Sequence, residues 1–133
     1  MKTLQIKTTR RTQFFDITRE VEQAVRESGV AHGLCYVFVP HTSAGIAINE
    51  HSDPSVAFDV EEILDRMIPL QGPYRHVEGN TDSHMKTILA GNSQTIFVEN
   101  GKLALGEWQG IFLCEFDGPR QRNIFVKIVA DPN

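Results

Sequence analysis

The C-terminal third of the chain alternates apolar and polar residues over a length that only several consecutive strands can explain. Residues 94–129 read QTIFVENGKLALGEWQGIFLCEFDGPRQRNIFVKIV. Alternate side chains of a strand lie on one face, whereas a helix would repeat its apolar residues about every 3.6 positions. The dipeptides Asn100–Gly101 and Asp117–Gly118 favour tight turns. The pattern therefore predicts a series of strands joined by hairpins.

Shorter segments with strand character occur in the first half of the chain. Residues 3–9 and 13–17 are rich in Thr, Ile and Phe, and the intervening TRRT predicts a first hairpin. Residues 33–40 and 45–50 have the same strand-like composition. Pro40 ends the first of these because proline has no backbone N–H to donate.

Three segments between the strands carry helix signals. The first helix is expected from Thr18 as N-cap to a stop at Gly29, and the second has Asp53 as cap and Pro54 in its first position. The apolar stripe of the second helix comprises Val56, Val60, Ile63, Leu64 and Met67. The third helix covers about residues 82–90. Strands grouped at the two ends with helices between them predict a single α+β domain, residues 1–133, with antiparallel sheets predominating.

The composition excludes several classes of function. Thirteen Lys and Arg against seventeen Asp and Glu give a net charge of -4, without the basic surface that nucleic acid requires. No apolar stretch approaches the roughly 20 residues of a membrane-spanning helix, and the N-terminus lacks the apolar region of a signal peptide. We therefore expect a cytoplasmic protein with no nucleic-acid or membrane partner. Cys35 and Cys114 form no CxxC pair and are interpreted as buried thiols.

Polar side chains that would not serve the packing of a hydrophobic core are concentrated in three loop segments: HTSAG at 41–45, YRHVEGNTDSHMK at 74–86 and GEWQG at 106–110. In the first, His41, Thr42 and Ser43 could hold an anion or orient a metal ligand. The alternative is a turn whose hydroxyls bond only to nearby backbone.

The second segment offers His76 and His84 as imidazole ligands for zinc or a similar ion, although their spacing matches no zinc signature. His84 falls in the first turn of the third helix, where a phosphate would be attracted, with Arg75 and Lys86 close in sequence. The alternative is that these are ordinary solvated histidines.

The third segment contains Trp108, the only tryptophan of the chain, which could stack on a flat ring or pack against the edge of the core. Its neighbour Gln109 could orient a ligand or face water. Glu50 is a candidate for general acid or base work. His32 and His51 are interpreted as surface residues.

Taken together, HTSAGIAINE, Asp53–Pro54, YRHVEGNTDSHMK and GEWQGIFLCEFDGPR resemble the YjbQ family, whose members are described as secondary thiamine-phosphate synthase enzymes. The resemblance runs from about residue 2 to residue 129. It implies a small α+β fold with the character of a β-sandwich. It also implies a homotrimer in which the polar motif residues meet near the subunit boundary.

The resemblance further implies a divalent metal ion, zinc above all, held by His41, His76 and His84. Candidate acid or base residues are Glu50 and Asp82. The expected ligand-binding residues are Thr42, Ser43, Asn49, Arg75, Lys86, Trp108, Gln109 and Arg120. Glu107 replaces the threonine usual before Trp108 and adds a negative charge that would repel a phosphate.

The implied function is that of a metal-assisted enzyme acting on a phosphorylated small molecule. The family reaction joins a pyrimidine pyrophosphate to a thiazole phosphate, giving thiamine phosphate and pyrophosphate. The alternative is a noncatalytic trimer that binds a metal or a phosphorylated metabolite.

Overall fold

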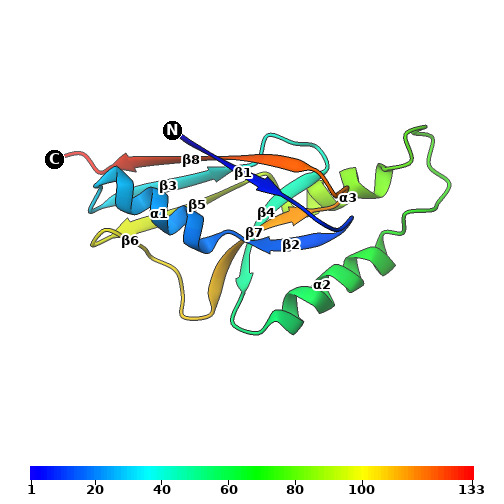
Figure 1. The fold of residues 1–133 in the computed structure, drawn as a ribbon, viewed down its shortest axis with the longest axis horizontal. Helices are drawn as coiled ribbons and strands as arrows, with labels where there is room; N and C mark the ends of the chain where they lie inside the picture. Colours follow the sequence, from blue (N-terminus) through cyan, green and yellow to red (C-terminus); the bar gives the residue numbers. More distant parts are fainter.

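The computed structural model describes residues 1–133 and contains two antiparallel sheets and three helices (Figure 1). The elements are β1 (Lys2–Lys7), β2 (Gln13–Asp16), α1 (Thr18–Ser28), β3 (Gly33–Phe38), β4 (Ala44–Glu50), α2 (Pro54–Met67), α3 (Thr81–Ala90), β5 (Ser93–Glu99), β6 (Lys102–Leu103), β7 (Gln109–Glu115) and β8 (Gln121–Ala130). The larger sheet has the strand order β1-β8-β3-β5-β6, and the smaller has the order β2-β7-β4. The predicted α+β class with antiparallel sheets is confirmed.

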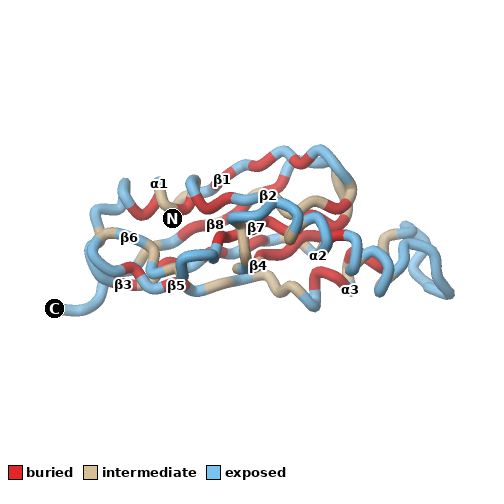
Figure 2. Tube along the Cα trace, turned by 90° about the horizontal axis from the view of Figure 1, so that it is seen from below, coloured by how far each residue is buried: buried red, intermediate tan, exposed pale blue.

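The main core lies where the two sheets and α1 face one another. Inward-facing side chains such as Val37 of β3, Ile46 of β4 and Ile124 of β8 are fully buried there. Figure 2 shows how buried residues recur along the strands, as the alternating sequence requires. Each buried aliphatic side chain contributes about 1.5–3 kcal/mol of transfer free energy. The same two-residue period that predicts the strands therefore also builds the core.

Two of the predicted hairpins are wrong. β1 pairs with β8 and β2 with β7, so the first two strands belong to different sheets. The turn at Asp117–Gly118 likewise leads from β7 in one sheet to β8 in the other, through a cis Gly118–Pro119 bond. Thr8 secures this crossing, because its Oγ1 is bonded to Glu115 Oε1 at 2.8 Å and to the Arg120 carbonyl at 2.9 Å.

The third predicted turn is confirmed. Asn100 and Gly101 have φ values of 53° and 75° and join β5 to β6 as an antiparallel pair. Positive φ at both central residues is what a tight hairpin with the native twist of its strands requires.

α1 begins one residue away from the predicted position. Ile17 is its N-cap, and Thr18 is the first helical residue. The backbone N–H of Thr18 donates to Oδ1 of Asp16, the residue before the N-cap, at 3.0 Å. The predicted stop at Gly29 is confirmed, with a φ of 70°.

α2 has the predicted start, but its predicted apolar stripe is packed only in part. Asp53 accepts a hydrogen bond from the Ser55 N–H, and Pro54 opens the helix, as expected. The apolar stripe is only partly covered: Ile63 is 43% exposed and Met67 is 67% exposed, while the buried residue of this helix is Glu61. The helix lies against the outer face of the smaller sheet (Figure 1), where Ala57 and Leu64 pack against a second apolar cluster of Phe112, Cys114 and Phe116. Glu61 adds hydrogen bonds to Arg10 and to the Phe14 N–H.

Both cysteines are free and buried, as predicted. Burial raises the pKa of the Cys35 thiol to about 11 and also raises that of Cys114. None of the helices combines the length and apolarity needed to cross a membrane.

Candidate functional site

The structure divides the predicted site residues between the two ends of strand β4. Thr42 and Ser43 directly precede β4, whereas Asn49 and Glu50 complete it. A strand rises about 3.3 Å per residue, so these two pairs lie roughly 20 Å apart. The register pairs Ala44 with Glu115 of β7 and Glu50 with Gln109. We call the first group, His41, Thr42, Ser43, His76 and His84, the histidine end, and the second group, Asn49, Glu50, Trp108 and Gln109, the tryptophan end.

Two of the predicted metal ligands meet at the histidine end. The Nδ1 atom of His84 lies 2.8 Å from the Thr42 carbonyl oxygen. Because a carbonyl only accepts, Nδ1 must donate, and the lone pair of the neutral ring is left on Nε2. The ring of His76 lies with its centroid 5.5 Å from that of His84, at an interplanar angle of 62°. A histidine held by a backbone carbonyl through its other nitrogen is the usual arrangement of a metal ligand.

His41 does not complete this pair within one chain. Its Nε2 accepts a hydrogen bond from the backbone N–H of Asn123 at 3.0 Å, so the neutral ring carries its proton on Nδ1. No three His, Cys, Asp or Glu side chains converge closely enough to hold a metal ion. The single chain thus does not bring the three predicted histidines together as a metal site, and Nε2 of His41 is already bonded to backbone.

The charge state of His41 is nevertheless well defined. Burial lowers its pKa, and the positive charges of Arg122 and Arg120 lower it further, against an opposing effect of Glu115. His41 is therefore neutral at pH 7 and presents an Nδ1–H donor rather than a cation.

Ser43 belongs to a buried polar cluster that the sequence did not reveal. Arg122 Nη2 donates to Ser43 Oγ at 2.8 Å, and Arg122 Nε donates to Glu115 Oε1 at 2.9 Å. Burial raises the pKa of Glu115, but hydrogen bonds from Arg122, Asp117 and Thr8 outweigh it and hold the pKa below its usual value. A signal for this cluster exists in the sequence, since Glu115 interrupts the apolar run of β7. Ser43 thus supports the strand end rather than facing a ligand.

Asp82 and Lys86 also have a structural role. The side chain of Lys86 is 1% exposed, and its Nζ lies 3.0 Å from Asp82 Oδ2 and 2.8 Å from Asp65 Oδ1. Arg11 donates two hydrogen bonds to the same Asp82 carboxylate, at 3.0 and 3.1 Å. Burial raises the pKa of Asp82, but the bonds from Arg11 and Lys86 outweigh it, so the net shift is downward. Asp82, the predicted base, is therefore a weak one. The charge of Lys86, the predicted phosphate ligand, is already neutralised by Asp82 and Asp65.

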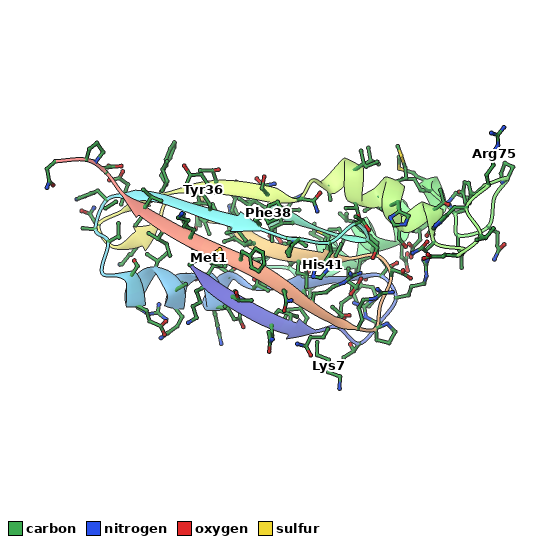
Figure 3. All side chains as sticks on the ribbon, turned by 90° about the horizontal axis from the view of Figure 1, so that it is seen from above. Met1, Lys7, Tyr36, Phe38, His41 and Arg75 are labelled. Atoms are coloured by element: carbon green, nitrogen blue, oxygen red, sulfur yellow. The ribbon has the colours of Figure 1, made fainter.

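The two remaining arginines of the prediction differ in position. Arg75 lies at the tip of an exposed loop and points away from the body of the molecule (Figure 3). Arg120 is bonded to Asp117, with Nη2 3.1 Å from Oδ2. The same Asp117 oxygen accepts from Asn80 Nδ2 at 2.9 Å, directly before α3. Arg120, unlike Arg75, therefore lies beside the helix start that carries His84.

Unpartnered polar atoms cluster around the histidine end. Asn80 Oδ1, Thr81 Oγ1 and Asn123 Oδ1 are buried and have no hydrogen-bond partner in the chain. Asn80 and Thr81 open α3, and Asn123 donates its backbone N–H to His41. An unsatisfied buried polar group costs about 1–3 kcal/mol. These atoms suit a region that receives hydrogen bonds from water or a bound molecule.

At the tryptophan end the polar side chains mainly bond to nearby backbone. Glu50 Oε2 accepts from the Asp53 N–H at 3.0 Å, Asn49 Oδ1 from the Glu50 N–H at 2.7 Å, and Gln109 Oε1 from the Gly106 N–H at 2.8 Å. Trp108 is 58% exposed, which rules out the core-packing alternative. These residues do not share a site with the histidines of the same chain.

Comparison with known proteins agrees with this fold over its full length. Residues 2–131 match the family profile described as UPF0047 protein YjbQ-like. UPF0047 protein YugU of Bacillus subtilis is 51% identical over 131 residues, covering 98% of this chain and 99% of that protein. A UPF0047 protein of Methanocaldococcus jannaschii is 50% identical over 127 residues, covering 96% and 92% of the two chains.

Solved structures show the same architecture. An uncharacterized YjbQ/UPF0047 protein of Clostridium acetobutylicum superposes with a TM-score of 0.95 at 53% identity, covering 97% of this chain and 100% of that one. A protein of unknown function from Sulfolobus solfataricus gives a TM-score of 0.94 at 33% identity, covering 98% and 96%. Sequence and fold thus agree with the motifs of the three polar segments, and the chain belongs to the YjbQ-like UPF0047 family.

Proposed function

We propose that the protein is a metal-assisted enzyme that acts on a phosphorylated small molecule at the histidine end. The observation that carries this proposal is the pairing of His84 with His76. His84 is fixed by the Thr42 carbonyl with its Nε2 lone pair free, and the His76 ring lies beside it. Such a pair suits zinc or a similar divalent ion.

The other residues of the histidine end have complementary roles in this proposal. A divalent ion bound to the two histidines would neutralise negative charge on a phosphate or a departing pyrophosphate. His41 is neutral and can donate its Nδ1–H to a phosphate oxygen. Arg120, with its side chain 49% exposed, adds positive charge at the start of α3. The formation of thiamine phosphate, implied by the resemblance, is the first reaction to assay.

The aromatic platform expected for a heterocyclic substrate lies elsewhere in the chain. Trp108 is at the tryptophan end, roughly 20 Å from the histidines along the strand direction. A second copy of the chain would have to supply it. We therefore propose the homotrimer as the functional unit. In support, Tyr36, Phe38 and Phe97 leave an exposed apolar area on the larger sheet, and Figure 3 shows Tyr36 and Phe38 together on β3.

Replacement of the paired histidines tests the metal assignment. His84→Ala and His76→Ala proteins, purified without added metal, should lose bound zinc in elemental analysis and bind added zinc at least tenfold more weakly, because each removes one of two ligands. His32→Ala is the matched control, since His32 is exposed and bonded to Glu99 on the far side of the fold. A His84→Ala protein that retains metal and activity would show that the assignment is wrong.

One observation favours the alternative of a noncatalytic binding protein. Asp82 is bonded to Arg11 and Lys86, and Glu50 lies at the other end of β4, so neither predicted acid or base residue is free beside the histidines. Zinc-loaded protein that binds phosphate but turns over no phosphorylated substrate would support this second function.

A further inference from the structure

His51 forms a second histidine centre, away from the histidine end. Its Nδ1 lies 2.8 Å from Asp16 Oδ2. The other oxygen of this carboxylate accepts from the Thr18 backbone N–H at 3.0 Å and from Thr18 Oγ1. Burial raises the pKa of Asp16, but these bonds from Thr18 and His51 outweigh it and lower the pKa overall. An ionised Asp16 only accepts, so His51 donates from Nδ1 and keeps the lone pair on Nε2.

The imidazole of His51 is also fixed by the backbone of β7. A Cβ atom at Gly110 would lie 2.3 Å from Cγ and from Nδ1 of His51, so the ring packs directly over the glycine. The backbone N–H of His51 donates to the Trp108 carbonyl at 3.0 Å. Glycine at 110 therefore provides the space for this ring, and Asp16 sets its tautomer. A loosely held surface histidine would need neither a glycine under its ring nor a carboxylate bonded to its Nδ1.

This ring lines a cavity of about 460 Å³ between α1 and the β6 region. Other polar walls are provided by Glu22, Arg26, Lys102 and Gln109. The size is within the range of small-molecule sites, about 300–1,000 Å³. Lys102 makes no salt bridge within the chain, and Gln109 uses only its oxygen, leaving its amide N–H groups free.

The charges of the cavity limit what it can bind. Arg26 and Lys102 are positive and Glu22 is negative, which leaves one net positive charge apart from the Asp16–His51 pair. A singly charged oxyanion is balanced by this arrangement, whereas pyrophosphate would be repelled by Glu22. His51 Nε2 adds one hydrogen-bond acceptor at the same cavity.

We propose that this cavity is a second ligand site, which binds a small carboxylate that also carries a hydroxyl or amine donor. Lys102 and Arg26 hold the carboxylate, and His51 Nε2 accepts a hydrogen bond from the donor. Asp16 is a positioning residue that acts through His51. Within one chain the site is separate from the histidine end, and the proposal does not depend on the metal-assisted function.

The experiment uses glycolate as the probe and acetate, which lacks the hydroxyl group, as the control ligand. Binding is followed through the side-chain NMR resonances of His51. Glycolate should shift them saturably and bind several-fold more tightly than acetate, because only glycolate donates to Nε2. Lys102→Gln should weaken glycolate binding about tenfold. Lys7→Gln, a change on the larger sheet, should leave it unaltered.

Asp16→Asn separates positioning from simple structural support. An Asn amide can donate to His51 Nδ1, which places the ring proton on Nε2 and removes the acceptor. The variant should therefore bind glycolate no better than acetate, and the ring nitrogen shifts should report the reversed tautomer.

Three results would overturn the proposal: no saturable shift of His51 with either probe, wild-type affinity in Lys102→Gln, or an unchanged preference for glycolate in folded Asp16→Asn. Binding lost in His84→Ala but kept in Lys102→Gln would also overturn it, since the anion would then lie at the histidine end. Unchanged glycolate binding in a metal-free His84→Ala protein supports it, whatever the fate of the metal-assisted function.

Discussion

At the scale of single residues, the buried charges are the most informative feature. Arg122 and Glu115 have side chains only 2% and 0% exposed and are bonded to each other and to Ser43 and Thr8. Burying two charges costs solvation free energy that only complete pairing offsets. Loss of one partner would leave the other buried and unpaired at the end of β4.

Replacing Glu115 should therefore be severe. We expect Glu115→Gln to lower the free energy of unfolding by about 3–5 kcal/mol, measured by urea denaturation, because Arg122 keeps its charge without a counter-ion. Glu99→Gln is the matched control, since Glu99 has its side chain 57% exposed, and it should cost less than about 1 kcal/mol. Equal effects of the two changes would contradict this account.

The lowered pKa of Asp82 predicts a dependence of stability on pH. Because the folded pKa lies below the unfolded value of 3.8, the stabilising effect is complete above that value and is lost as pH falls through the folded pKa. Asp82→Asn should be less stable than the wild type near neutral pH, and the difference should shrink in acid. Urea unfolding at a series of pH values checks this, and a difference that stays constant into acid would refute it.

Residue roles were predictable where they depend on near neighbours in the sequence. The Asp53 cap and the Asn100–Gly101 turn are confirmed because their geometry is decided within a few residues. The sequence predicts a phosphate-binding role for Lys86, but in the fold its ammonium group forms ion pairs with Asp82 and Asp65. A sequence shows which charges a chain has, and only the fold shows which of them pair.

At the scale of elements, α2 is oriented by one buried carboxylate beside a small apolar contact. Glu61 receives two bonds from Arg10, at 2.7 and 3.2 Å, and one from the Phe14 N–H at 2.8 Å. Its side chain is 6% exposed, while the apolar stripe of the helix is only partly covered. The helical period predicted the element correctly, but the contact that orients it is polar.

Removing this carboxylate should loosen the helix selectively. We expect Glu61→Ala to destabilise the protein by about 1–3 kcal/mol, because the Phe14 N–H and Arg10 lose their acceptor. Hydrogen exchange should accelerate in α2 more than in β8. Glu62→Ala, one position away and exposed, is the control. Uniform acceleration across all elements would contradict a local attachment.

Strand partners were less predictable than the strands themselves. Alternation identifies β1 and β2 but carries no information about pairing, and a short connection suggested a hairpin. The chain instead passes from one sheet to the other between them, as it does again between β7 and β8. Sandwich-like folds often break local pairing in this way, because sequential strands can serve different layers.

At the scale of the whole molecule, the outer face of the larger sheet remains uncovered. Tyr36 and Phe38 of β3 and Phe97 of β5 are 41%, 44% and 66% exposed, and Phe38 stacks on Phe125 of β8 with centroids 6.3 Å apart. Contiguous apolar areas of this kind mark association surfaces. The predicted homotrimer would cover such a face.

Charge on this face should prevent association. We expect the wild type to have about three times the 15.0 kDa mass of one chain in light scattering, and Phe97→Lys to shift toward the monomer while keeping its circular dichroism. Met67→Lys, on exposed α2, is the control and should remain associated. A wild-type monomer, or dissociation by Met67→Lys alone, would show that the outer sheet face is not the contact.

The order of strands has a consequence for how the protein is made. β8, the last element of the chain, lies between β1 and β3 in the larger sheet, so the first strand has no neighbour until the last one arrives. During translation, β1 must wait with its backbone hydrogen-bonding groups unpaired until β8 has left the ribosome. Completion of the larger sheet therefore depends on β8, and a nascent chain that lacks β8 would expose its first strand to chaperones.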